Sequence, residues 1–181
     1  MSEDKFDVVI IGGGPAGLSS AVYTARSDLS VLVLDEPDKL LDKVDKIENY
    51  FGFPEGVSGK ELLGRGKKQA ERFGAEIRME KALLIDIDDD DYLVKTADNS
   101  YKTRALIIAP GIQHHRPSLD GIKEFEGRGV SYCVTCDAPL FKDQKVGLLG
   151  NEDLVAKEAL ELYEYTQDIK IYTNGRELDL S

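Results

Sequence analysis

The stretch that decides the fold is FDVVIIGGGPAG, residues 6–17. Its first six residues are nearly all apolar and rich in β-branched side chains, which is typical of a buried parallel strand. The glycines that follow satisfy the pattern Gly-x-Gly-x-x-Gly. Apolar residues then recur at helical spacing over residues 18–26, and a second strand is expected over Val31–Leu34. These features predict a complete βαβ unit.

Each glycine of the pattern has its own physical role. Gly12 allows a tight turn, Gly14 lets a pyrophosphate approach the backbone, and Gly17 lets the helix pack closely on the strand. The phosphate is then expected at the helix N-terminus, where amide groups and the helix dipole favour an anion. Asp35 lies 18 residues beyond Gly17 and ends the second strand, so it is expected to bind a ribose hydroxyl. The pattern predicts a dinucleotide site.

The rest of the first half reads as a helix followed by strands. Ser58 and Glu61 form a capping box, which opens a helix that is expected to end at Gly74. Strands are expected over residues 77–86, 91–96 and 104–109. The acidic run at 86–91 is interpreted as a solvated hairpin tip, because a calcium loop would need a central glycine and a distal glutamate.

Both cysteines lie in SYCVTCD, residues 131–137. A Cys-x-x-Cys pair serves as half of a zinc site, as a redox disulfide or as two structural thiols. Zinc would need further ligands, and the adjacent His114 and His115 lack the usual spacing, so no metal site is expected. A redox pair formed by Cys133 and Cys136, with Asp137 directly behind it, is the favoured interpretation.

A second strand–helix–strand pattern follows the cysteines, over residues 145–150, 154–163 and 169–172. Its glycine pattern is incomplete, because Glu152 and Val155 stand where glycine or alanine belongs. The charge of Glu152 opposes a bound pyrophosphate. The expected fold class is therefore α/β, with a Rossmann-like three-layer domain and β-meander over residues 1–112. A partial second Rossmann-like domain over 117–181 follows a polar linker.

Composition narrows the class of partner and the compartment. The 181 residues include 23 basic and 34 acidic side chains, a formal charge of −11, and the isoelectric point is near 4.7. Such a field repels nucleic acid and anionic membranes, so neither is expected as a partner. No apolar run approaches the roughly 18 residues that a membrane span needs. The charged N-terminus does not resemble a signal peptide, and two cysteines suit a cytoplasmic location.

Four segments resemble the low-molecular-weight thioredoxin reductase family of flavoproteins, class II of the pyridine nucleotide-disulfide oxidoreductases. They are residues 12–17, Glu48-Asn49-Tyr50, Ala109-Pro110-Gly111 and residues 133–137. The resemblance implies FAD in the first domain, and a second domain of the NAD(P)-binding type that carries the redox disulfide. The cofactor-binding residues that it implies are Gly12, Gly14, Pro15, Ala16, Gly17, Asp35, Glu36, Asn49, Ala109 and Gly111.

The resemblance also implies a role for each residue of the redox segment. Cys136 would lie nearer the flavin as the charge-transfer thiolate, and Cys133 would attack the disulfide of a thioredoxin-like protein. Asp137 would donate and accept the proton that this exchange requires. A carboxylate beside the pair suits that task, because thiol–disulfide exchange depends on thiolate formation. A homodimer is expected from the same resemblance.

Three departures from the family argue against NADPH as the electron donor. Residues 38–41 replace a usual Gly-Gly-Gln-Leu stretch, and Glu152 breaks the second glycine pattern. The basic cluster that would hold the NADP 2′-phosphate is replaced by Thr173-Asn174-Gly175-Arg176, of which only Arg176 is basic. The flavin is therefore expected to receive electrons from a ferredoxin or another reduced flavin, or weakly from NADH.

Length bears on the function as well. Members of this family have about 300 residues, as two domains of this size require, and a Gly-Asp motif for FAD is expected after the second domain. The chain is therefore expected to be an N-terminal portion. The leading hypothesis is a flavin-dependent disulfide reductase that acts on thioredoxin-like proteins. The alternatives are a truncated FAD-binding module for electron transfer or assembly, and the reductase component of a peroxide-scavenging system.

Overall fold

The computed structural model describes residues 3–37, 40–112 and 117–181. The chain divides into two compact units, Met1–Pro117 (unit 1) and Ser118–Ser181 (unit 2). Asp38 and Lys39, and the linker residues 113–116 with His114 and His115, lie outside the described residues.

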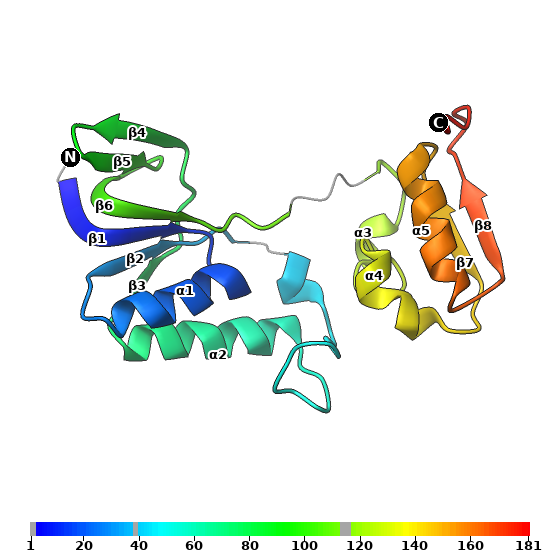
Figure 1. Ribbon diagram of the computed structural model, residues 1–181, viewed down its shortest axis with the longest axis horizontal. Coiled ribbons are helices and arrows are strands. Elements are labelled where there is room, and N and C mark those ends of the chain that lie inside the picture. Colours follow the sequence, from blue (N-terminus) through cyan, green and yellow to red (C-terminus); the bar gives the residue numbers. More distant parts are fainter. Residues whose placement is uncertain (1–2, 38–39, 113–116) are drawn as a thin grey trace. The chain divides into compact units, whose positions relative to one another are not determined.

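A six-stranded sheet with the order β3-β2-β1-β6-β5-β4 organises unit 1 (Figure 1). Strand β1 is parallel to both β2 and β6, and β2 is parallel to β3, whereas β4 and β5 continue β6 as an antiparallel meander. Ile11, the last residue of β1, pairs with Leu34 and with Ile108. The carboxyl ends of three neighbouring strands therefore meet at one edge. The strands are β1 (Glu3–Ile11), β2 (Val31–Leu34), β3 (Glu76–Arg78), β4 (Leu84–Asp88), β5 (Asp91–Lys95) and β6 (Ser100–Ile108).

Alternating side chains of the central strands separate two cores. Val8 and Ile10 of β1 pack with Val31 and Val33 of β2 against the helices α1 (Pro15–Ala25) and α2 (Gly59–Arg72). Val9 faces the opposite way and packs with Leu32, Leu34, Val94 and Tyr101. Figure 1 shows the helices on one side of β1 and the β4–β5 hairpin on the other. The predicted Rossmann-like fold with a β-meander is confirmed.

The helix boundaries follow local signals. Ser58 is the N-cap of α2 and its side chain accepts a hydrogen bond from the Glu61 amide at 3.2 Å, so the predicted capping box forms on that side. Gly74 follows the helix with a φ of +95°, a conformation that glycine adopts without strain. A short 3-10 helix, η1 (Leu40–Lys43), was not predicted.

The single strand expected over residues 77–86 is wrong, because the chain changes partners there. Strand β3 pairs with β2, whereas β4 pairs with β5, and residues 79–83 make the transition. Strand β6 also begins at Ser100, four residues earlier than expected, since its first half pairs with both β1 and β5. Both differences depend on distant strands, which local propensity does not report.

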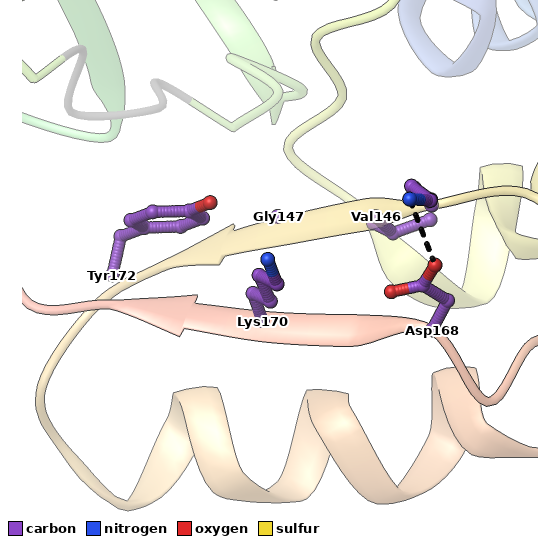
Figure 2. Close-up of a pocket in the computed structure, with 6 residues that line it drawn as sticks. Val146, Gly147, Asp168, Lys170 and Tyr172 are labelled. Carbon is purple, nitrogen blue, oxygen red and sulfur yellow. Dashed lines mark ion pairs between the residues drawn. The ribbon is translucent and has the colours of Figure 1, made fainter.

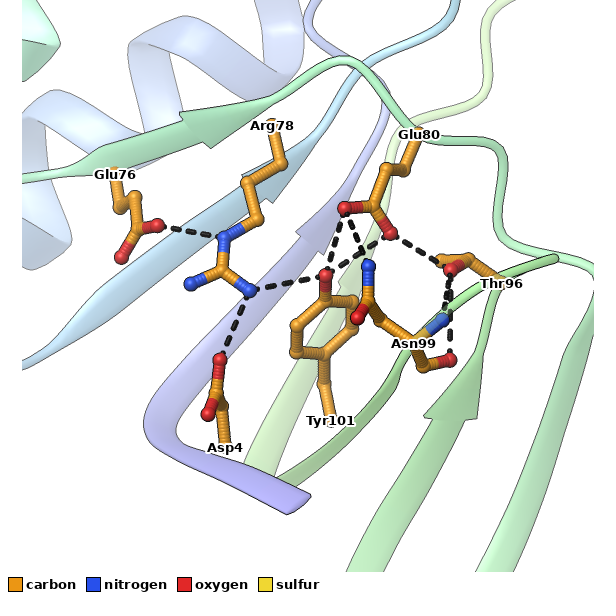
Figure 3. Close-up of polar contacts among 7 residues, drawn as sticks. All are labelled: Asp4, Glu76, Arg78, Glu80, Thr96, Asn99 and Tyr101. Carbon is orange, nitrogen blue, oxygen red and sulfur yellow. Dashed lines mark hydrogen bonds and ion pairs between the residues drawn. The ribbon is translucent and has the colours of Figure 1, made fainter. Parts of the chain in front are cut away.

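Seven polar residues bind the transition segment to the sheet (Figure 3). The Arg78 guanidinium donates to Tyr101 Oη at 3.1 Å, and this buried hydroxyl donates to both carboxylate oxygens of Glu80 at 2.9 Å. Thr96 and Asn99 donate to the same carboxylate at 2.7 and 3.0 Å. Arg78 also binds Asp4 and Glu76. Glu80 therefore joins the meander to the end of β3.

These contacts decide the charge state of Glu80. Burial alone would raise the pKa of this carboxyl, but hydrogen bonds from Thr96, Tyr101 and Asn99 and the charge of Arg78 together bring it below its ordinary value. The pKa of Tyr101 is raised, mainly by burial. The network therefore stabilises a carboxylate beside a neutral phenol.

One ion pair joins α2 to the carboxyl end of β2. Lys67 Nζ lies 2.9 Å from Asp35 Oδ2, and the Asp35 side chain has no exposed surface. Asp35 Oδ1 accepts a hydrogen bond from the Gly13 amide at 3.1 Å. A buried carboxylate needs such partners, because its removal from water costs several kcal/mol.

Unit 2 contains a second βαβ motif, as predicted: β7 (Val146–Leu149), α5 (Asp153–Tyr163) and β8 (Ile169–Tyr172), with β7 and β8 parallel. Its core consists of Ala138, Leu148, Val155 and Leu162, with Val134 packed against them. Three short helices were not predicted: α3 (Ile122–Phe125), α4 (Val134–Asp137) and the 3-10 helix η2 (Ala138–Phe141).

Replacement of Glu80 by Gln is expected to reduce the free energy of unfolding by about 1–3 kcal/mol at pH 7. The pKa of Glu80 is lowered in the folded protein, so its stabilisation is present above the ordinary pKa of 4.5. It is lost as the pH falls through the lower folded pKa. Urea unfolding should therefore separate variant and parent at pH 7, and the difference should shrink as the pH is lowered below 4.5. Glu71→Gln, an exposed change on α2, is the control, and equal effects of the two variants at pH 7 would contradict the interpretation.

Replacement of Lys67 by Met is expected to destabilise unit 1 by about 2–4 kcal/mol, because it leaves the buried Asp35 carboxylate without its cation. Combining Lys67→Met with Asp35→Asn removes the charge and should restore about half of the loss. Thermal and urea unfolding, followed by circular dichroism, measure both. Lys68→Met changes the exposed neighbour in the same helix; a Lys67→Met variant as stable as this control would show that the pair contributes little.

Candidate functional site

The glycine loop after β1 is held by close backbone contacts. Gly12 has a φ of +104°, and a Cβ there would lie 2.1 Å from the carbonyl oxygen of Ala109. A Cβ at Gly17 would lie 1.8 Å from the carbonyl oxygen of Gly12. Packing alone therefore requires glycine at both positions. At Gly14, by contrast, no heavy atom of the described residues lies within 4 Å of the place of a Cβ, so this position borders open space.

The N-terminus of α1 opens into that space. The helix has 11 residues and begins at Pro15, and its N-cap, Gly14, has no side chain to cap the first amide groups. Its first turn, residues 15–18, has no acidic residue. Amide groups at such a terminus and the helix dipole favour a phosphate. The predicted residues Gly12, Gly14 and Gly17 therefore fit the pyrophosphate of a dinucleotide such as FAD.

The predicted ribose ligand, Asp35, lies beside this loop. Its carboxylate contacts Gly13 and Lys67, as described above, and a Cβ at Gly13 would lie 2.4 Å from the Asp35 carboxyl carbon. Lys67 was not predicted as a site residue. A signal was available, since Lys67 follows the buried Leu63 by four residues and so shares its helix face. Glu36 is exposed and pairs with Lys81 at 3.0 Å.

The remaining predicted cofactor residues lie on two other segments. Ala109 donates its amide to the carbonyl of Ile11 at 2.8 Å, which places it beside the glycine loop, and Gly111 has a φ of +72°. Asn49 is exposed on a loop that Ile47 and Val57 close through two backbone hydrogen bonds. The structure thus brings residues 12–17, Asp35 and Ala109 together, with Asn49 on a separate loop.

The predicted pairing of the two cysteines is present. Cys133 and Cys136 are joined by a disulfide. Cys133 is the N-cap of α4, and its Sγ accepts a hydrogen bond from the Cys136 amide at 3.2 Å. Cys133 is partly buried and Cys136 is exposed. Val134 and Ala138 pack into the core of unit 2, so apolar anchors hold the segment in place.

Asp137 is bound by a residue that was not predicted. Ser131 Oγ donates to Asp137 Oδ2 at 2.5 Å and accepts a hydrogen bond from the Cys133 amide at 3.1 Å. Neighbouring Tyr132 donates to the buried Glu126 carboxylate at 2.8 Å. The available signal was the position of Ser131 in the same seven residues as the cysteines and the acid, because a serine side chain often binds backbone two residues on.

The second βα turn differs from the first. A Cβ at Gly150 would lie 3.0 Å from the Cβ of Val155, so Val155 occupies space beside this glycine. Glu152 is exposed at the N-cap of α5 and Asp153 is in the first turn. Asp153 also accepts hydrogen bonds from the amide and hydroxyl of Ser181, the former at 2.8 Å. Carboxylates therefore stand where a pyrophosphate would need amide groups.

A shallow pocket of about 240 Å³ lies on the face of β7 and β8 that points away from α5 (Figure 2). Lys145 pairs with Asp168 there at 3.7 Å, and the Tyr172 ring packs over Gly147. None of the predicted site residues lines it. We therefore interpret it as the polar outer face of this small sheet.

Residues 3–37, 40–112 and 117–181 contain no group of three or more His, Cys, Asp and Glu side chains that could hold a metal ion. None of their helices combines the length and apolar character that a bilayer crossing requires.

Comparison with known proteins agrees with this geometry. The family model for pyridine nucleotide-disulphide oxidoreductases matches residues 6–156. Thioredoxin reductase of Aquifex aeolicus is 40% identical over 96% of the chain. The crystal structure of thioredoxin reductase from Streptococcus pyogenes superposes on 99% of the chain with a TM-score of 0.91 at 32% identity, and the chain covers 59% of it. The atypical thioredoxin reductase TRi from Desulfovibrio vulgaris is 40% identical with a TM-score of 0.57, over 99% of this chain and 60% of that one.

The match has a definite extent. The chain spans about half the length of the curated relatives it matches, 54% for the Aquifex protein. The family model nevertheless covers most of this chain, including the glycine loop, both cysteines and Asp137. The chain therefore belongs to the pyridine nucleotide-disulphide oxidoreductase family.

Proposed function

We propose that this protein is a flavin-dependent disulfide reductase that passes electrons from FAD to the Cys133–Cys136 disulfide and on to a thioredoxin-like protein. The observation that carries the proposal is the disulfide in unit 2, with a hydrogen-bonded carboxylate at its end, in a chain whose unit 1 has a dinucleotide loop. The similarity to thioredoxin reductases supports this choice among disulfide reductases.

Unit 1 supplies the residues for FAD. The amide groups of Ala16 and Gly17 would hold the pyrophosphate, and Pro15, which has no N–H to donate, would start the first turn of α1. Asp35 would bind the adenosine ribose once the Lys67 ammonium, which pairs with its buried carboxylate, moves aside. Glu36, Asn49, Ala109 and Gly111 would border the remaining cofactor. When bound, FAD would supply an electron pair to reduce the disulfide. We assign residues 1–112 to this role and 117–181 to the redox unit.

Unit 2 supplies the residues for exchange with the partner disulfide. In the reduced chain, the Cys133 thiolate attacks one sulfur of that disulfide, forming a mixed disulfide and releasing one partner thiolate. Cys136 then attacks Cys133 Sγ, which restores the internal disulfide and releases the second partner thiolate. Asp137 accepts and donates the protons that these steps exchange. The Cys136 amide, which donates to Cys133 Sγ at 3.2 Å, favours negative charge on the attacking sulfur.

We further propose that the electron donor is not NADPH but a ferredoxin or another reduced flavin, with NADH as a weak substitute. Glu152 and Asp153 place carboxylates at the start of α5, where a second dinucleotide would need amide groups. Residues 173–176 form a turn in which Arg176 donates its amide to Thr173, and Arg176 is the one basic residue among them. A single guanidinium is a weak clamp for a 2′-phosphate.

We also propose partners and a cellular location for this reaction. The formal charge of −11 opposes association with nucleic acid and anionic membranes. We propose separately that the protein is a cytoplasmic homodimer. Thioredoxin-like proteins are the proposed partners because the relatives are named as thioredoxin reductases. The competing function, an FAD-binding module without reductase activity, is an outcome of the first experiment below.

The purified protein is expected to bind FAD and then to accept four electrons per chain in an anaerobic dithionite titration, two for the flavin and two for the disulfide. Cys133→Ser should accept two. Asp35→Ala should weaken FAD binding by about 10-fold, measured by flavin fluorescence, because a charge-assisted hydrogen bond is lost. A flavin that takes up two electrons in the parent would favour the binding module. No FAD binding at any concentration would overturn both functions.

The FAD-loaded protein is mixed with NADPH under anaerobic conditions. NADPH is expected to reduce the flavin on the order of 100-fold more slowly than a reduced ferredoxin or reduced free flavin does. The carboxylates at the start of α5 and the lack of a basic cluster for the 2′-phosphate each weaken NADPH binding. Stopped-flow absorbance of the flavin measures the rates. Flavin bleaching within seconds at micromolar NADPH would refute the proposed donor and leave the disulfide chemistry unaffected.

A further inference from the structure

We propose that Ser131 is the positioning residue of this redox centre, and that its hydroxyl holds the Asp137 carboxylate in place for proton transfer with the Cys133–Cys136 pair. The inference rests on the proposed function, because it assigns Asp137 a part in thiol–disulfide exchange. Ser131 acts through the acid and through the Cys133 backbone.

The hydroxyl group has one hydrogen to donate, and two acceptors compete for it. Asp137 Oδ2 lies at 2.5 Å and the carbonyl oxygen of Cys133 at 3.2 Å. A hydrogen bond to a carboxylate is shorter and about twice as strong as one to a neutral acceptor. The hydrogen therefore belongs to Asp137. The Ser131 oxygen is left to accept from the Cys133 amide at 3.1 Å.

These bonds connect Asp137 to Cys133 twice. The Asp137 amide donates to the Cys133 carbonyl at 3.2 Å, and the Asp137 carboxylate reaches the Cys133 amide through the serine oxygen. The neighbouring residues Val134 and Ala138 are packed in the core of unit 2 and hold the backbone. What remains adjustable is the side-chain rotation of Asp137. Ser131 fixes that rotation.

A similar serine–carboxylate bond occurs in unit 1, where the serine also accepts from the amide of the same aspartate rather than from a cysteine amide. Ser30 Oγ donates to Asp7 Oδ2 at 2.7 Å and accepts from the Asp7 amide at 2.9 Å. Ser30 directly precedes β2 and Asp7 lies in β1, both in unit 1. The hydrogen bonds from Ser30 are the main reason that the pKa of Asp7 is lowered. The motif alone is therefore structural. What distinguishes Ser131 is that its carboxylate directly follows a redox cysteine, and Ser30 offers a matched control.

The experiment measures thiol–disulfide exchange without flavin or electron donor. The chain is reduced with dithiothreitol, freed of reagent and mixed with glutathione disulfide at pH 7. Each turnover breaks the glutathione disulfide, forms the Cys133–Cys136 disulfide and moves two electrons and two protons from the chain to two glutathione thiols. The rate of thiol loss from the protein is followed by quenching and alkylation.

Ser131→Ala is expected to exchange about 10-fold more slowly than the parent, since a displaced acid loses part of the 10²–10⁴-fold that proton transfer typically contributes. Ser131→Thr keeps the hydroxyl and should recover a rate within about threefold of the parent. Ser30→Ala should leave the rate unchanged. Circular dichroism and melting temperature establish that each variant is folded. A Ser131→Ala variant as fast as the parent would overturn the proposal.

A second pair of variants separates positioning of the acid from support of the loop. Asp137→Asn keeps an oxygen that Ser131 can bind but cannot carry the proton. If Ser131 acts through the acid, adding Ser131→Ala to Asp137→Asn changes the rate by less than about twofold. A further 10-fold loss in the double variant would assign Ser131 to the loop backbone alone and refute the inference. Because the assay contains no flavin, absence of FAD binding would affect the proposed function and not this result.

Discussion

The contact between the Gly12 carbonyl and the backbone of Gly17 is the constraint on which unit 1 depends. The Cα of Gly17 approaches this oxygen so closely that a Cβ would lie 1.8 Å from it, and a Cβ at Gly12 would meet the Ala109 carbonyl at 2.1 Å. Three chain segments, the end of β1, the start of α1 and the end of β6, therefore meet with backbone against backbone. The close approach also aims the first amide groups of α1 at the open space beside Gly14. The close packing and the proposed binding of a pyrophosphate would thus have the same cause.

The β1–α1 turn of unit 1 and the β7–α5 turn of unit 2 differ in the charge near the helix N-terminus. In unit 1 the turn between β1 and α1 has no acidic side chain, and Asp35 stands at the end of the next strand, held by Gly13 and Lys67. In unit 2 Val155 packs beside Gly150, and Asp153 brings a carboxylate into the first turn of α5. The same βαβ topology can thus present opposite charge at its helix N-terminus. Fold similarity between the units does not imply a shared ligand.

Features that depend on neighbouring residues could be predicted from the sequence, and features that depend on distant partners could not. The glycine loop, β1, β2 and the capping box at Ser58 each depend on residues that are only a few positions apart in the sequence. The division between β3 and β4 depends on Glu80, whose partners Thr96, Asn99 and Tyr101 come from later in the chain. The Lys67–Asp35 pair likewise needs the packing of α2 on the sheet.

This distinction applies to the candidate site itself. The candidate dinucleotide site is assembled from β1, α1, β2, β6 and α2, so the role of a residue such as Lys67 becomes visible only after the helices pack on the sheet. The proposed redox centre lies almost entirely within residues 131–137, and its donors and acceptors are joined by local hydrogen bonds. Within these residues the sequence pattern indicates the sulfurs and the acid but not the serine, because two closely spaced cysteines can be assigned a chemical role from residue type. The role of a serine hydroxyl can be assigned only from the geometry of its hydrogen bonds, and here that geometry directs the single hydroxyl hydrogen of Ser131 to Asp137.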